Sequence, residues 1–455
     1  MSESSSQQGI KLGFLELAPG VSRTSAFVFF YASFSAIGLL TFVSTGTAQV
    51  LNAIGVPGNE QGTITGDLVV ITEIVQILIF GLVGVLADRI GRREVATAGI
   101  MLMGLGYALY PYADSVSELM VYRAVYALGL GASAGMVGTL IADYPANSSR
   151  GKFVAVGGAF NGIGVVVVTV IFGANMAPML VNSGYDPLTA TRIAHGIVAA
   201  ACFLSGIIYY LGLKKGTPGS LEDRPSTKEL MASGITEAIK NPRIALAYAC
   251  GFVARGDQVI LGTFTVLWGA RVGIDSGMDY ATASGKGALI FAIAGTASLI
   301  WLPILGVVMD RMNKVSAIIL CMGCAALGYS ATYLVDEATM FTTSGFPLSL
   351  QATSLFFLLG VGQISAFMGA TVLISQEAPK LKRGAVVGMF NTFGAIGIFI
   401  AVAIGGRLFD SYGGYAPFAL IGAMNVVVVL FAIIVRIKAP GDSSPGKSIA
   451  SSAAA

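Results

Sequence analysis

The 455-residue chain has little charge and almost no histidine. Only 11% of its residues are charged against 55% that are hydrophobic, and it contains one His, two Trp and four Cys. A soluble domain has roughly 25% charged residues, so this composition excludes a water-soluble fold, a disordered chain and a disulfide-stapled secreted fold. The formal net charge of +3 is too small and too dispersed to indicate a nucleic-acid partner. The composition leaves a protein that lies in a membrane.

The few cysteines and the single histidine offer no catalytic or metal site. Cys202, Cys250, Cys321 and Cys324 all fall in apolar runs, where a thiol behaves as a small hydrophobe. Cys321 and Cys324 have the spacing of a redox or zinc pair, but there is no second pair and no adjacent His. His195 alone cannot form a zinc site. We expect these residues to pack, and we expect no metal, no cofactor and no enzymatic activity.

What the sequence does have is long apolar runs rich in glycine. A helix needs about 20 mostly apolar residues to cross a bilayer, and the 59 Gly suit close helix packing in lipid. Alternating segments of about ten residues, as in a β-barrel, are not visible. We predict an all-α membrane protein whose spans lie at 24–50, 64–87, 95–113, 119–142, 153–180, 193–213, 244–269, 287–308, 315–335, 350–376, 385–406 and 416–437.

Lys and Arg set the predicted orientation, because positive residues stay on the cytoplasmic side. With the N-terminus inside, only Arg192, Arg271, Lys286 and Arg407 fall in the opposite loops or their margins. We therefore predict a plasma (inner) membrane protein with both termini cytoplasmic. We also expect an uncleaved first helix and a monomer. The predicted parts are an N-tail at 1–23, six-helix bundles at 24–213 and 244–437, a cytoplasmic central loop at 214–243, and a disordered tail at 438–455.

Two motifs recur in the second half of the chain. The segment from Gly84 to Arg93, GVLADRIGRR, returns 222 positions later as GVVMDRMNK, from Gly306 to Lys314. Asp143, followed by the pair at 150–151, likewise matches Glu377, followed by the pair at 383–384. Gly164 and Gly397 each lie 14 residues beyond the Arg of these pairs. Two motifs in the same order indicate an internal duplication.

These residues resemble the signature loop of the major facilitator superfamily, Gly-x-x-x-Asp-Arg-x-Gly-Arg-Arg. A fainter match is Arg123 followed by Ala127, Gly129 and Gly131. The resemblance implies two pseudo-symmetric six-helix bundles, a substrate cavity between them, and alternating access. It also implies a cytoplasmic gate, for which we name Gly84, Asp88, Arg89, Gly91, Arg92, Arg93, Asp310 and Arg311; the alternative is that the basic residues only hold topology. The family's Gly-Pro antiporter signature is absent from the stretch GGAFNGIGVVVV.

Five charged residues lie well inside predicted spans and are the informative ones: Asp67, Glu73, Arg123, Arg255 and Asp257. Each costs about 2.5 to 3.5 kcal/mol at a helix centre, so each needs a partner, a water-filled cavity or a function. The repeat duplicates none of Glu73, Arg123, Arg255 and Asp257. We expect Arg123 to reach the outer surface or to pair with Glu118.

The resemblance places Arg123, Arg255 and Asp257 on helices that line the cavity. We expect Arg255 to hold an anionic group, because its planar fork fits carboxylate or phosphate; the alternative is an ion pair with Glu73 or Asp257. On an unbroken helix, Arg255 and Asp257 cannot pair, although the nearby glycines could let the helix unwind. Asp257 and then Glu73 are the candidate proton carriers. Polar residues that could complete the site are Ser33, Ser35, Asn161, Gln258, Gln363 and Asn391.

Together these features predict a secondary transporter for a small organic solute, with an organic anion favoured and proton coupling as a hypothesis. Its partners are then the substrate, protons and the lipid bilayer. A multidrug or organic cation exporter is the alternative, in which Asp257 or Glu73 binds the cation. A non-transporting receptor or scaffold is a remote third reading.

Overall fold

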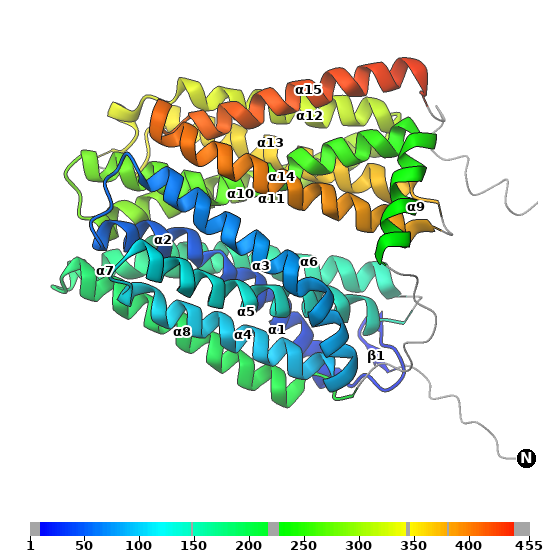
Figure 1. Ribbon diagram of the computed structural model, residues 1–455, viewed down its shortest axis with the longest axis horizontal. Coiled ribbons are helices and arrows are strands. Elements are labelled where there is room, and N and C mark those ends of the chain that lie inside the picture. Colours follow the sequence, from blue (N-terminus) through cyan, green and yellow to red (C-terminus); the bar gives the residue numbers. More distant parts are fainter. Residues whose placement is uncertain (1–9, 147–148, 217–226, 343–345, 380–381, 441–455) are drawn as a thin grey trace, which may run out of the picture. The chain divides into compact units, whose positions relative to one another are not determined.

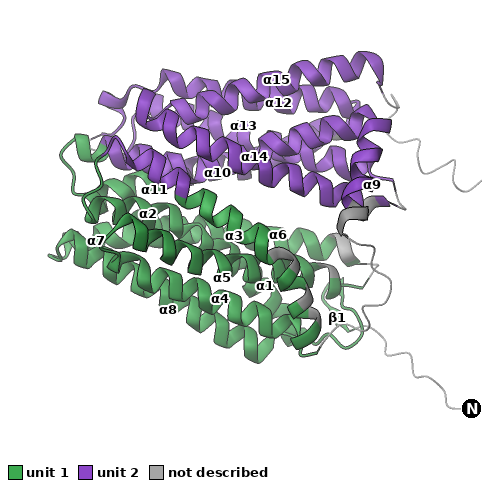
Figure 2. Cartoon of the chain, in the orientation of Figure 1, with its two compact units in different colours: residues 1–57, 68–222, 273–289 green, residues 58–67, 223–272, 290–455 purple. Residues whose placement is uncertain are grey.

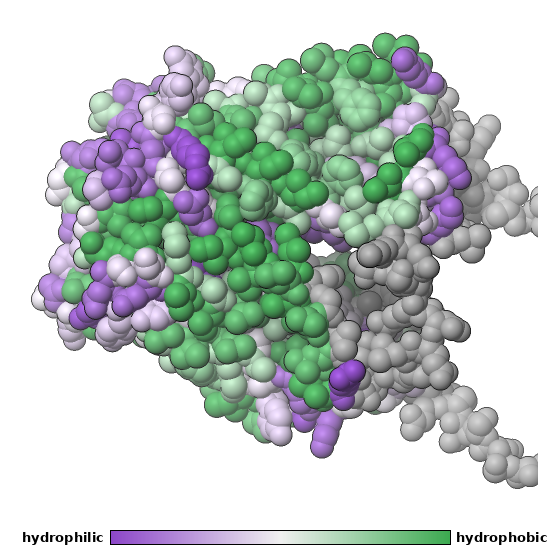
Figure 3. Space-filling view, in the orientation of Figure 1, coloured by the Kyte–Doolittle hydropathy of each residue, from purple (hydrophilic) through white to green (hydrophobic). Residues whose placement is uncertain are grey.

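The protein is seen in a computed structural model that describes residues 10–146, 149–216, 227–342, 346–379 and 382–440 (Figure 1). Within these ranges, twelve helical segments are long and apolar enough to cross a membrane, which confirms the twelve predicted spans. Apolar side chains run along the helices, and hydrophilic ones gather near their ends (Figure 3). The predicted C-terminal tail lies outside the described residues, apart from its first three.

The helices before the central loop are α1 (Arg23–Leu40), α2 (Phe42–Ala53), α3 (Gln61–Ile90), α4 (Arg92–Leu109), η1 (Tyr110–Tyr112), α5 (Val116–Asp143), α6 (Arg150–Val168), η3 (Thr169–Met176), α7 (Ala177–Asn182) and α8 (Pro187–Gly212). Those after it begin with α9 (Thr227–Lys240) and α10 (Pro242–Asp275), and continue with α11 (Tyr280–Asp310), α12 (Lys314–Ser330), η4 (Ala331–Leu334), η5 (Glu337–Thr339), α13 (Leu350–Glu377), α14 (Arg383–Tyr412) and α15 (Ala416–Lys438).

The chain divides into two compact units (Figure 2). Unit 1 holds residues 1–57, 68–222 and 273–289, and unit 2 holds residues 58–67, 223–272 and 290–455. The predicted bundles at 24–213 and 244–437 were continuous segments. The units differ from them because the first turns of α3 belong with unit 2, and the first turns of α11 belong with unit 1.

The first turn of α3 is held in unit 2 by the end of α14. The Asp410 carboxylate accepts hydrogen bonds from the backbone N–H groups of Gly62, at 2.8 Å, and Thr63, at 2.6 Å. These N–H groups have no partner within their own helix, so Asp410 caps the helix from another element. Asp67 pairs with Arg407 at 3.4 Å one turn further along. Asp67, predicted to lie near the outer surface, therefore belongs to a contact between helices.

The repeated glycines Gly164 and Gly397 each lie at a close helix crossing, one in each unit. Gly164 in α6 lies against the backbone of α1, and a Cβ on Gly38 would come within 2.7 Å of the Gly164 carbonyl oxygen. In unit 2, Gly397 in α14 lies against α10, and a Cβ on Gly256 would come within 3.0 Å of the Gly397 carbonyl oxygen. Small residues let the backbones cross closely. The duplication read from the sequence is therefore a duplication of helix crossings.

Two spans of unit 1 depart from a regular α-helix, and neither is the span for which the sequence suggested unwinding. The first span is interrupted at Thr41, whose hydroxyl donates to the Gly38 carbonyl at 2.7 Å and competes with the helical bond. The fifth span contains a π-helical stretch, η3. By contrast, α10 is continuous from Pro242 to Asp275 despite its glycines, so the suggested unwinding is wrong for this structure.

Two segments predicted as tail or loop are folded. Residues 11–16 form a hairpin of β1 (Lys11–Leu12) and β2 (Leu15–Glu16), with Lys11 opposite Glu16. The central loop contains α9. The sequence indicates this helix by the apolar residues Met231, Ile235 and Ile239, which are spaced four apart. The polar residues between them concealed this amphipathic pattern.

Candidate functional site

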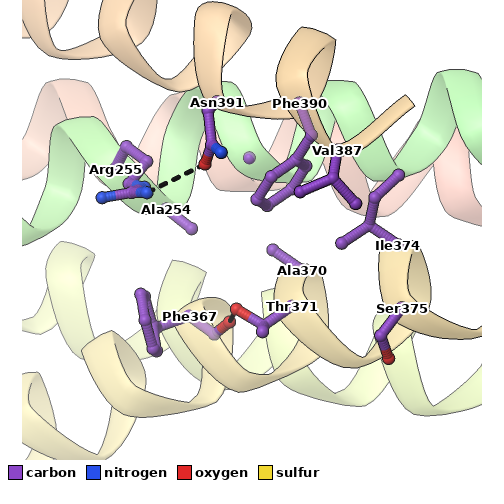
Figure 4. Close-up of a pocket in the computed structure, with 11 residues that line it drawn as sticks. Ala254, Arg255, Phe367, Ala370, Thr371, Ile374, Ser375, Val387, Phe390 and Asn391 are labelled. Carbon is purple, nitrogen blue, oxygen red and sulfur yellow. Dashed lines mark hydrogen bonds between the residues drawn. The ribbon is translucent and has the colours of Figure 1, made fainter. Parts of the chain in front are cut away.

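Unit 2 has a pocket between α10, α13 and α14, with a volume of about 420 Å³ (Figure 4). That volume falls in the range of small-molecule sites. Phe367 and Phe390 contribute aromatic rings, and Thr371 and Ser375 contribute hydroxyl groups. The remaining lining is Gly251, Ala254, Arg255, Ala370, Ile374, Val387 and Asn391. The pocket is mostly apolar, and Arg255 is its one formally charged lining residue.

Arg255 is positioned by two features of α14. Its Nη2 donates a hydrogen bond to Asn391 Oδ1 at 3.0 Å, shown dashed in Figure 4. Gly394, one turn beyond Asn391, leaves room for the arginine stem, since a Cβ there would lie 2.6 Å from Arg255 Cγ. The guanidinium is therefore fixed at the pocket wall, with its orientation set by a neutral amide.

Asp257 does not share that wall. Its side chain is fully buried, and neither carboxylate oxygen has a hydrogen-bond partner among the described residues. Tyr329 of α12 donates to the Asp257 backbone carbonyl at 3.0 Å, so this side of α10 faces the interior of unit 2. Because α10 is unbroken, Arg255 and Asp257 point to different surroundings, as their spacing required.

Arg123 lies in unit 1 and is buried, with 5% of its surface exposed. Its Nε donates to Thr72 Oγ1 at 2.8 Å and its Nη1 to Thr47 Oγ1 at 3.4 Å, while the guanidinium lies 5.1 Å from the Tyr126 ring centre. The expectation that Arg123 reaches the surface or pairs with Glu118 is wrong. Glu118 instead accepts from the Asp114 backbone N–H. The threonine hydroxyl groups and the face of the Tyr126 ring stabilise the Arg123 guanidinium inside unit 1, so its side chain does not extend to the surface.

The other predicted polar residues are scattered. In unit 1, Ser33 is buried, Ser35 bonds Tyr209 at 2.7 Å, and Gln76 donates to half-buried Glu73 at 3.5 Å. The Asn161 Oδ1 atom, also in unit 1, is buried without a hydrogen bond among the described residues.

In unit 2, Gln258 is exposed and Gln363 accepts from Ser298 at 3.5 Å. Of the predicted substrate residues, the pocket contains only Arg255 and Asn391. The sequence analysis missed Phe367, Thr371 and Ser375. Their spacing of four on one helix face was a usable signal.

The predicted gate residues of unit 1 form an ionic cluster at a helix end. Arg92 pairs with Asp143, and Arg93 bonds Glu94 at 2.7 Å while lying 4.5 Å from the Tyr210 ring centre. Gly91 precedes α4 with φ of +112°, a conformation that favours glycine. Gly84 is half-buried within α3, Arg89 and Arg311 are exposed, and the side chains of Asp88 and Asp310 lie outside the described residues.

The matching positions of unit 2 also form an ionic cluster. Glu377, with 7% of its side chain exposed, lies 3.2 Å from Arg243 Nε and 3.8 Å from Lys314 Nζ. Asn241 donates to the same carboxylate at 3.2 Å. Lys314 lies 222 positions after Arg92, and Glu377 is the counterpart of Asp143. The ion pair of unit 1 is therefore repeated in unit 2 in a more buried form.

Two titratable side chains outside the spans, Glu237 and Tyr144, have shifted pKa values. A hydrogen bond and ion pair with Lys382, 2.7 Å away, lower the pKa of Glu237 in α9. Burial raises the pKa of Tyr144, after α5, to about 12, and its hydroxyl accepts from the Lys214 backbone N–H at 2.9 Å. No group of His, Cys, Asp and Glu residues in the described ranges could hold a metal ion.

Twelve spans, a duplicated set of glycine crossings and a duplicated ion pair define an integral membrane protein with two pseudo-symmetric six-helix halves. The family model of the Major Facilitator Superfamily matches residues 24–402. The chain belongs to this superfamily, whose members include transporters of many kinds, and the predicted fold class is confirmed.

Relatives and solved structures agree with this assignment. The chain is 25% identical to the magnetosome protein MamH of Paramagnetospirillum magneticum, over 87% of this chain and 89% of the relative. It is 26% identical to MamZ of the same organism over 83% of this chain, but spans only 57% of MamZ. The structure of a point mutant of the nucleoside transporter NupG matches with a TM-score of 0.71 at 12% identity, covering 90% of this chain and 99% of that one. That likeness concerns the fold alone.

Proposed function

We propose that this protein is a secondary transporter that binds a small organic anion at Arg255 and moves it by alternating access. The observation that carries the proposal is the fixed guanidinium in a mostly apolar pocket of about 420 Å³. The Asn391 amide oxygen accepts a hydrogen bond from the guanidinium, whose planar fork suits a carboxylate or phosphate. The aromatic rings of Phe367 and Phe390 would pack against the apolar part of the solute.

The names of MamH and MamZ state no transported solute, so the substrate is sought directly. A thermal-shift screen of the purified protein against organic acids and lipophilic cations, at two pH values, should return acids as stabilising ligands. Transport of the best ligand is then measured in proteoliposomes. We propose that the protein works in the inner membrane as a monomer. The distribution of Lys and Arg supports cytoplasmic positions for both termini.

Variants of the pocket test the role of Arg255. Loss of a charged hydrogen bond of about 1.5–3 kcal/mol should weaken binding roughly 10- to 100-fold in Arg255→Ala. Asn391→Asp would neutralise the guanidinium and should weaken anion binding in the same direction. Gly394→Ala should displace the arginine stem. The matched control is Gly388→Ala, also on α14, where no neighbouring atom lies within 4 Å of the added Cβ.

The same screen separates the anion carrier from the multidrug exporter. Stabilisation by lipophilic cations, and resistance to them on expression, would favour the exporter. Unchanged anion binding in both Arg255→Ala and Asn391→Asp would remove the guanidinium from the proposed role.

Proton coupling is a second part of the proposal, with Asp257 and Glu73 as candidate carriers. A carboxyl group inside a span is costly and usually functional, and proton carriage is a function that accounts for it. We expect substrate-driven proton movement to be lost in Asp257→Asn or in Glu73→Gln while substrate binding remains. Proton movement that persists in both variants would exclude both acids.

A further inference from the structure

Helix α9 presents a partly exposed apolar stripe. Met231, Ile235 and Ile239 are 39%, 44% and 80% exposed, and their spacing of four places them along one side of the helix. Green apolar side chains stand out over α9 in Figure 3. Lys240, which is also exposed, lies about 100° around the helix from Ile239.

Another side of α9 packs on the rest of unit 2. Gly234 packs on α14, where an added Cβ would lie 2.8 Å from both the Ala385 carbonyl oxygen and Met389 Cβ. Tyr248 of α10 donates to the Gly234 carbonyl at 3.1 Å, and Glu237 pairs with Lys382. In Figure 1, α9 runs crosswise to the long helices of its unit. The apolar stripe is therefore held outward by a specific docking contact.

The contact also fixes the depth of α9. α14 begins at Arg383, so Ala385 and Met389 lie in its first two turns, and Met389 is four residues, or about 6 Å, beyond Ala385 along the helix. Interfacial helices bury their apolar face about 5–10 Å into the boundary between headgroups and acyl chains. A helix resting on the first turn of a span lies at that boundary.

The face of α14 beneath α9 continues into lipid-facing surface. Ile396 and Ile400 follow Ala385 and Met389 on the same helical face, and they are 42% and 38% exposed. Asn391, which lines the pocket, points to the other side of α14. The stripe of α9 is thus continuous with the apolar flank of a membrane span, away from the pocket.

We propose that α9 is an interfacial anchor: its Met231, Ile235 and Ile239 side chains insert into the acyl-chain boundary of the bilayer, with Lys240 reaching the headgroups. The anchor holds the start of α10, because only Asn241 separates the two helices, and that residue bonds Glu377. The connection between the two halves of the chain is therefore tied to the membrane surface where it enters α10.

Spin labels test the anchor in the full-length protein. Cys202, Cys250 and Cys321 are buried, so Cys324→Ala gives a background with little labelling. Ile235→Cys, Ile239→Cys and Lys240→Cys are labelled and reconstituted in vesicles of phosphatidylethanolamine and phosphatidylglycerol. Leu327→Cys on α12, 69% exposed, and Asp114→Cys in an outer loop serve as lipid and water references.

Labels at 235 and 239 should resemble the lipid reference, accessible to oxygen and shielded from a water-soluble nickel complex, whereas the label at 240 should be nickel-accessible. Nickel access at all three sites would place α9 in water and overturn the proposal. Shielding of 235 and 239 from both reagents would mean protein covers the stripe, which would also overturn it. Ile239→Asp should expose a label at 235 to nickel, and the matched Thr236→Asp should not.

Discussion

Replacing Glu377 with glutamine should destabilise unit 2 more than any substitution of its partners. The Glu377 carboxylate is 7% exposed. Its oxygens lie 3.2 Å from Arg243 Nε and 3.8 Å from Lys314 Nζ, and one accepts a hydrogen bond from Asn241 Nδ2 at 3.2 Å. Removing one member of a buried ion pair costs about 3–5 kcal/mol. Arg243 and Lys314 are 27% and 44% exposed, and water solvates them when the carboxylate is gone. We therefore expect Glu377→Gln to cost about 2–3 kcal/mol.

The repeat supplies the matched control. Asp143, the counterpart of Glu377 in unit 1, is 39% exposed in its pair with Arg92, so Asp143→Asn should cost only about 0–1 kcal/mol. Lys314→Gln should fall in the same low range because the lysine is half in water.

Reversible unfolding in mixed micelles, titrated with a denaturing detergent, gives the free energies. A double-mutant cycle between Glu377→Gln and Arg243→Gln isolates their coupling. If Glu377→Gln costs no more than Asp143→Asn, the idea that burial controls the strength of these pairs is refuted.

Packing, capping and charge give three further predictions. Gly397→Ala, which would press a methyl group against the α10 backbone, should destabilise by at least about 2 kcal/mol, whereas Gly388→Ala should be neutral or stabilise by up to about 1 kcal/mol; thermal unfolding compares them. Asp410→Ala should cost about 1–2 kcal/mol at the start of α3 and speed amide exchange there, and equal exchange rates would contradict the cap. Lys382 lowers the pKa of Glu237 in the folded state. The stability that their ion pair contributes is therefore fully present above the unfolded-state pKa and is lost as pH falls through the folded-state pKa. We expect α9 to loosen only below the usual carboxyl range. Proteolysis of α9 against pH measures this, and Glu237→Gln should abolish the dependence.

Much of the fold followed from the sequence because its signals are local. Twenty apolar residues must become a helix in lipid, where every backbone group needs an internal partner. The duplicated motifs predicted equivalent roles for Gly164 and Gly397, and both lie at helix crossings. The same duplication paired Arg92 with Lys314 and Asp143 with Glu377, and the structure forms both ion pairs.

The candidate site was only partly accessible to sequence reasoning. Arg255 was identified because an isolated charge inside a span demands an explanation. Its partner Asn391 was one of several polar residues with no sequence feature to single it out, since the two lie 136 positions apart. Arg123 was expected near water, yet it is solvated by two threonines from neighbouring helices.

The sequence by itself determined the membrane, the number of spans and the repeat, since these depend on composition and periodicity. Only the tertiary structure decided which polar side chains meet. Rotation of each helix about its axis turned Arg255 towards a pocket and Asp257 into the core, and it left the apolar side of α9 uncovered. Those rotations are set by packing between segments far apart in the chain, which no local pattern encodes.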